Sequence, residues 1–156
     1  MKGMRAILFI VTFVVIATTF APTSAFAVMG EKASTVQTDM SRLQGQNLKV
    51  TSNSIYTTYS FHARGDIIKE YANSDGVIFA LSWLGRAPLN MRGIAGKHYG
   101  AYAAVRAMQP RLHVRHPIVV KTPLMTVYRG GHMRAWRGLA FIKSLAPSGV
   151  SARDLQ

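Results

Sequence analysis

The apolar residues Val36, Met40 and Leu43 recur at intervals of four and three residues along an otherwise polar segment. This spacing places them on one face of a helix. Gly45 follows the last of them, and glycine is the residue that most readily adopts the left-handed conformation at a helix end. We therefore predict a short amphipathic helix over 31–45.

After a polar stretch at 46–54, the chain alternates between two kinds of side chain from Ile55 to His62. Alternation with a period of two is typical of a strand with one buried face. Two more apolar runs follow, each after a turn sequence rich in Gly, Asn and Asp. Because short turns join consecutive strands as hairpins, we predict a three-stranded antiparallel meander at 55–62, 67–71 and 77–83.

The second half of the chain predicts a helical segment and further strands. Residues 89–108 have helical spacing, but three glycines interrupt it, so we expect one kinked helix or two short ones. A polar, proline-bounded loop at 109–117 follows, and Gly130-Gly131 predicts a two-residue hairpin turn. The whole pattern favours an α+β fold in which an antiparallel sheet has helices packed on one face. The two or three additional strands are predicted at 118–121, 124–129 and 132–141.

The N-terminus has the pattern of a secretory signal peptide over 1–27. Lys2 and Arg5 precede an apolar run of 16 residues, and a small-residue site follows at 25–27. A membrane-spanning helix needs about 20 apolar residues, so we expect membrane attachment only if this segment stays uncleaved. The sequence therefore predicts an exported protein, periplasmic or extracellular, with a single α+β domain over 28–156.

Composition and charge narrow the chemistry of the protein. The chain has no Cys, which excludes a disulfide scaffold, a thiolate zinc site and a Cys nucleophile. Its formal net charge is +13, and residues 76–153 contain twelve Lys and Arg but no Asp or Glu. Such a stretch either solvates its cations or faces an anionic partner. For an exported protein we expect that partner to be an envelope polymer, a lipid or another protein rather than a nucleic acid.

The predicted C-terminal hairpin gathers basic side chains near its tip. With the turn at 130–131, Arg129, His132 and Arg134 share one face of the two strands. Two guanidinium groups and an imidazole have the chemistry of a clamp for a carboxylate or phosphate, because Arg donates bidentate hydrogen bonds and His adds a titratable donor. The alternative is that these cations are solvated or pair with acidic residues from the first half of the chain.

Known catalytic motifs are scarce in this sequence. It contains no Gly-x-Ser-x-Gly elbow, no His-Glu-x-x-His helix and no phosphate-binding Gly-Lys-Ser loop. His113 and His116 have a metal-binding spacing but no third ligand nearby in the sequence, and we expect no metal and no cofactor. The leading interpretation is a non-catalytic exported module that binds an anionic partner through its basic C-terminal half. The alternative is a small secreted hydrolase or metal-dependent enzyme that uses His62, His132 and Glu70.

Two distinctive segments lie near the C-terminus, GGHMRAWRGLAF at 130–141 and LAPSGVSARDL at 145–155. They resemble the signature of an uncharacterised bacterial secreted family, known as domain of unknown function 2844. The segments KEY at 69–71 and VIFALSW at 77–83 are similar to the middle of that family. The resemblance implies export and a single small domain, and it implies no activity.

Overall fold

The strands assemble into one seven-stranded antiparallel sheet in the computed structural model, which describes residues 29–110 and 117–155. The strand order is β1-β2-β3-β4-β7-β6-β5, so β4 is the central strand. The α+β class and the antiparallel sheet predicted from the sequence are confirmed. The strands are β1 (Gly45–Ser52), β2 (Thr57–Ala63), β3 (Asp66–Ala72), β4 (Ile78–Gly85), β5 (Ile118–Lys121), β6 (Thr126–His132) and β7 (Ala135–Phe141).

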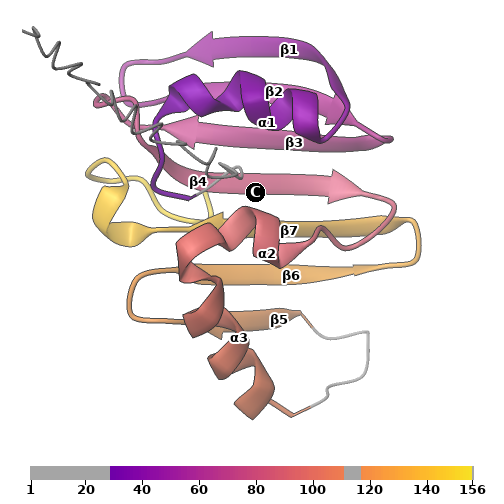
Figure 1. Ribbon diagram of the computed structural model, residues 1–156. Coiled ribbons are helices and arrows are strands. Elements are labelled where there is room, and N and C mark those ends of the chain that lie inside the picture. The colour runs from indigo at the N-terminus through magenta and orange to yellow at the C-terminus, as the bar shows by residue number, and fades with distance from the viewer. Residues whose placement is uncertain (1–28, 111–116, 156) are drawn as a thin grey trace, which may run out of the picture.

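The three α-helices lie on the same side of this sheet, with α1 in front of β2 and β3 and α3 in front of β5 (Figure 1). The helical segment predicted at 89–108 consists of two short helices. They are separated at Gly96, where a φ of +49° breaks the helical path at low cost only for glycine. The helices are α1 (Val36–Arg42), α2 (Met91–Ala95) and α3 (Tyr99–Met108), and short 3₁₀ turns occupy Ala33–Thr35, Gly96–His98 and Lys143–Leu145.

The main core fills the space between these helices and the sheet. The inner strands direct every second side chain toward it, because successive residues point to opposite faces. Trp83 of β4 lies over Gly138 of β7, its register partner, and a Cβ at position 138 would collide with the indole ring. The largest core side chains on this side include Phe61, Ile68, Leu81, Trp83 and Val127 of the sheet and Val36, Met91, Ile94 and Tyr102 of the helices.

The polar stretch at 46–54, for which the sequence pattern predicted no element, is largely a strand. Residues Gly45–Ser52 form β1, which pairs antiparallel with β2 at one edge of the sheet. Most of its side chains are exposed. An edge strand is held by backbone hydrogen bonds to one neighbour and needs few apolar residues, so hydrophobic periodicity does not reveal it.

The predicted turn of the C-terminal hairpin was also wrong. Gly130 and Gly131 lie within β6, and the turn residues are Met133 and Arg134. The hydrophobic pattern explains the difference, because a hairpin register is selected by what it buries. In the observed register Val127 pairs with Ala140, and both are buried, whereas the predicted register paired Val127 with a charged arginine.

The described chain begins inside the core. Met29 is fully buried, and the Gly30 N–H donates to the Ile78 carbonyl at 2.8 Å, which ties this segment to the start of β4. The predicted signal peptide, residues 1–27, lies outside the described residues, as do His113 and His116. Within the two described ranges, no helix has the length and apolar character needed to cross a membrane.

Candidate binding groove

The candidate site lies on the face of the sheet that is opposite the helices. Side chains two residues apart on a strand share a face, so two neighbouring rows of register partners line this side. The first row is Lys69, Ser82, Leu139 and Tyr128, and the second is Ile67, Leu84, Arg137 and Gly130, each in the order β3, β4, β7, β6.

The C-terminal segment covers one end of this face. Leu155 packs with Tyr71, Phe79 and Phe141 in a second, smaller core. The Tyr71 hydroxyl donates to the Leu155 carbonyl at 3.2 Å, and burial raises the pKa of Tyr71. The chain end is thereby held on the sheet, and Leu155 forms a wall at the boundary between the covered and uncovered parts.

Beside that wall lies an open-face groove with a volume of about 900 Å³. Small-molecule sites usually measure about 300–1,000 Å³, so the groove is large enough for a ligand. Its lining combines apolar and basic side chains from both rows with residues of the β6–β7 hairpin. The lining residues are Ile67, Lys69, Ser82, Trp83, Leu84, Pro117, Tyr128, Arg129, Gly130, Gly131, His132, Met133, Arg137, Gly138, Leu139 and Leu155.

The charge of the open-face groove has one sign. Lys69, His132 and Arg137 are exposed, and none of the described lining residues is acidic. Asp154 precedes the lining residue Leu155, and its carboxylate accepts hydrogen bonds at 2.7 Å from both the backbone N–H and the hydroxyl of Ser151. The Ser151 hydroxyl and N–H lower the pKa of Asp154, which stays ionised within its own turn. The groove therefore presents cations to solvent.

The structure separates the three residues predicted to form an anion clamp. Arg129 is the register partner of Gly138 and lies on the helix side of the sheet. Its Nη1 donates to the Tyr102 hydroxyl at 3.2 Å. His132 is exposed at the end of β6, with Nδ1 3.2 Å from the Met133 carbonyl oxygen. Arg134 is exposed in the turn itself, with a φ of +67°. Of these three, His132 lies on the open face at the rim of the groove, Arg129 also borders the groove, and Arg134 is outside its lining.

The enzyme alternative required His62, His132 and Glu70 to meet, and the sheet does not bring them together. Glu70 is buried on the helix side of β3, whereas alternation places His62 on the open face. His62 and His132 lie on strands four steps apart, a separation of about 19 Å at the usual strand spacing. Among residues 29–110 and 117–155, no group of three or more His, Asp and Glu could hold a metal ion.

The sequence model of the family described as "Protein of unknown function (DUF2844)" matches residues 25–155. The chain belongs to this family. No curated protein and no solved structure matches it.

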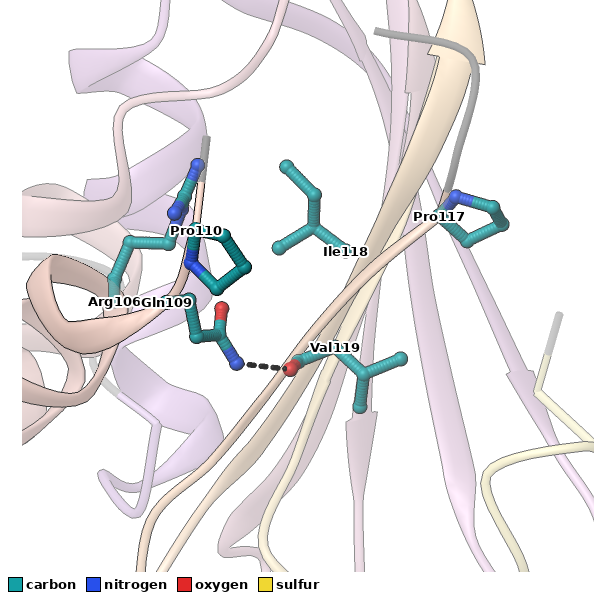
Figure 2. Close-up of a pocket in the computed structure, with 6 residues that line it drawn as sticks. All are labelled: Arg106, Gln109, Pro110, Pro117, Ile118 and Val119. Carbon is teal, nitrogen blue, oxygen red and sulfur yellow. Dashed lines mark hydrogen bonds between the residues drawn. The ribbon is translucent and has the colours of Figure 1, made fainter. Parts of the chain in front are cut away.

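A second hollow in this DUF2844 protein lies between the end of α3 and β5 (Figure 2). It has a volume of about 150 Å³, below the usual range for ligand sites. The Gln109 amide donates to the Val119 carbonyl at 2.8 Å and ties the end of the helix to the edge strand. This contact stabilises the edge of the sheet, and the open-face groove remains the better candidate for a ligand.

Sequence reasoning missed Lys69, Leu84 and Arg137 as candidate site residues. In sequence they lie on three strands, and nothing local connects them. The sheet order brings them together because β7 inserts next to β4. One local signal could have found Leu84. It lies two residues after Ser82, on the strand face where a polar side chain is expected.

Proposed function

We propose that this DUF2844 protein is an exported, non-catalytic module that binds an anionic component of the cell envelope through its open-face groove. The observation that carries the proposal is the lining: exposed Lys69 and Arg137 stand beside an apolar floor, and no described lining residue is acidic. Such a surface attracts anions at long range and holds them by charge-assisted hydrogen bonds. Export rests on the signal-peptide pattern at 1–27.

The non-catalytic part of the proposal rests on what the groove offers to a reaction. His132 is its general-base candidate, and in a catalytic triad the histidine is oriented by a buried carboxylate. Its Nδ1 lies 3.2 Å from a backbone oxygen at an exposed hairpin end, and the buried Glu70 faces the other side of the sheet. The groove supplies donors for binding an anion and no described acid to complete a catalytic pair.

The basic C-terminal half still supplies most of the binding charge, but the binding site lies on the open face of the sheet and not at the hairpin tip. Arg137 of β7 replaces Arg134 as the main guanidinium, and Lys69 joins from the first half of the chain. Anion binding by Arg129 and Arg134 stays a prediction. Variants of Arg134 test it separately, because that side chain lies in the turn beyond the groove lining.

The test compares two double variants with the same loss of charge. Lys69→Ala/Arg137→Ala removes the groove cations, and Lys97→Ala/Lys143→Ala removes two exposed cations elsewhere. Binding is measured by co-sedimentation with vesicles of phosphatidylglycerol and phosphatidylcholine in equal parts and by titration with polygalacturonate.

We expect the groove variant to lose about tenfold in affinity for at least one of these anions, and the control to lose much less. Binding should also weaken steeply as salt rises from about 0.05 to about 0.5 M. Equal losses in the two variants, or binding that ignores salt, would show that the groove is not the anion site.

A further inference from the structure

The floor of the open-face groove exposes apolar surface in the middle of the sheet. Leu84 belongs to β4, the central strand, yet its side chain is 51% exposed. Its register partners on either side are Ile67, which is half-buried, and Arg137. An antiparallel sheet often leaves one face to solvent, but the side chains on that face are normally polar. Exposed apolar side chains at its centre are therefore characteristic of a binding surface.

Cations flank this apolar floor on two sides. Arg137 is the direct neighbour of Leu84 on β7, and Lys69 lies one row away on β3. Both side chains are exposed, and neither has an ion-pair partner within the described part of the chain. A guanidinium and an ammonium without a carboxylate partner are free to bind an oxyanion, and the guanidinium donates two parallel hydrogen bonds to a phosphate or carboxylate.

Gly130 leaves the groove open next to Arg137. It is the register partner of Arg137 on β6, and a Cβ at this position would meet Pro117 at 3.7 Å and nothing closer. Its φ is not in the left-handed region. A side chain at position 130 would therefore fit the backbone and occupy groove space. A substitution there changes the volume of the groove and leaves its charge unchanged.

We propose that the open-face groove binds a single-chain lipid amphiphile with an anionic head. The alkyl chain lies across Ile67 and Leu84, and the head group, a phosphate or carboxylate, is held by Arg137 and Lys69. The groove lining extends from β3 to β6. This distance is three strand spacings, about 14 Å, which gives room for an alkyl chain that lies across the strands. This inference rests on the proposed function and specifies its ligand, because a purely ionic partner would need no apolar floor.

The experiment is calorimetric titration with four probes that separate head from chain. Dodecyl phosphate and dodecanoate carry both parts and differ in the head. Dodecyl maltoside carries the chain with a neutral head, and inorganic phosphate carries the head alone. Each amphiphile is kept below its micelle-forming concentration. We expect at least one anionic amphiphile to bind at least about tenfold more tightly than dodecyl maltoside and inorganic phosphate, and the tighter of the two anionic probes identifies the head.

Two variants test the apolar part of the site without changing its charge. Gly130→Val fills the groove beside Arg137, and Leu84→Ser removes the exposed apolar side chain. Each should weaken binding of the anionic amphiphile about tenfold. Leu124→Ser is the matched control, because Leu124 is 59% exposed and lies outside the groove lining. Thermal unfolding followed by circular dichroism verifies that all three variants are folded.

The outcomes separate this inference from the proposed function. If anionic amphiphiles bind no better than dodecyl maltoside, or if both groove variants bind like the control, the lipid ligand is wrong. If polygalacturonate binding nevertheless depends on Lys69 and Arg137, the anion-binding function stands with a purely ionic ligand. If neither kind of anion binds in a groove-dependent way, both proposals fail.

Discussion

Asp39 of α1 and Glu70 of β3 are each only 1% exposed, and the charge of Asp39 acts on Glu70 across the interface between helix and sheet. Both oxygens of Asp39 and one of Glu70 have no hydrogen-bond partner among the described residues. The Thr35 hydroxyl near Asp39 already donates to the Lys32 carbonyl at 2.9 Å. Two carboxyl groups are thus buried together beneath α1.

Burial is the main reason that both carboxyl groups have a raised pKa. It raises the pKa of Asp39 to about 6, against the opposing effects of Thr35 and of the positive charge of Arg42. Burial and, after it, the charge of Asp39 raise the pKa of Glu70 to about 8. At neutral pH Glu70 therefore keeps its proton, which spares the core a second negative charge.

The first prediction concerns stability against pH. Between pH 6 and pH 8 the folded protein holds the Glu70 proton that the unfolded chain has released, because the pKa of Glu70 rises from 4.5 to about 8 on folding. The free energy of unfolding should therefore fall with rising pH by up to about 1.4 kcal/mol per unit across this window. Glu70→Gln removes the titrating group and should flatten the curve there. Urea unfolding at a series of pH values measures both curves.

Asp75→Asn is the control for this measurement, because Asp75 is exposed in the turn before β4. It should keep the decline between pH 6 and pH 8. A wild-type curve that is flat over this window would show that Glu70 is ionised in the folded protein.

The second prediction isolates the effect of Asp39 on Glu70. Asp39→Asn removes a negative charge that raises the pKa of Glu70, so the pH at which stability stops falling should move below about 8. Urea unfolding against pH locates this point, and nuclear magnetic resonance of the Glu70 carboxyl carbon measures the pKa directly. An unchanged Glu70 titration in the variant would mean that burial alone sets its pKa.

The third prediction contrasts two glycines. Gly138→Ala places a methyl group into the indole ring of Trp83, and overpacking of this kind costs about 1–3 kcal/mol. Gly100→Ala, in α3, meets nothing within 4 Å and should stabilise the protein by up to about 1 kcal/mol through helix propensity. Denaturant midpoints of the two variants should shift in opposite directions. A neutral Gly138→Ala would indicate that the indole ring moves aside freely.

The fourth prediction tests where the C-terminal hairpin turns. Arg134 has a φ of +67°, which is strained for a β-branched residue and unstrained for glycine. Arg134→Val should therefore destabilise the protein by about 1–2 kcal/mol, whereas Arg134→Gly should be neutral or stabilising. Thermal unfolding distinguishes the two. If the turn were at 130–131, position 134 would be a strand position and valine would be favoured.

The same variants test the predicted clamp at the hairpin tip. Arg134→Gly should leave binding to the open-face groove essentially unchanged, because position 134 is not part of its lining. Loss of anion binding in Arg134→Gly would show that the hairpin tip, and not the open-face groove, is the anion site.

Several elements could be predicted because their signals are local. Alternation in β2, the turn at 73–76 and the glycine interruption between α2 and α3 each involve neighbouring residues, and all three recur in the structure. Edge strand β1 and the hairpin register could not be predicted in this way. A polar strand forms because a partner strand is present, and two glycines suit either a turn or a strand that passes close to other groups.

The candidate site was even less accessible to sequence reasoning. Lys69 lies in a run with apolar residues on both faces, at 67–71, so alternation did not indicate which face Lys69 would occupy. Arg137 was overlooked because the predicted register gave prominence to Arg129 and Arg134. Its position beside Leu84 depends on the pairing of β7 with β4, two strands that the 49 residues 86–134 separate along the chain.

By itself, the sequence determined the α+β class, the antiparallel sheet and the uneven distribution of charge, because each of these follows from composition or short-range periodicity. The family followed from the resemblance of particular segments of the sequence. The tertiary structure alone decided which side chains share a surface. Strand order and register place Lys69, Leu84 and Arg137 in one groove and bury Asp39 with Glu70 under a helix. These depend on long-range pairing, which is selected by the burial of the whole core and leaves no mark on the local pattern of any single segment.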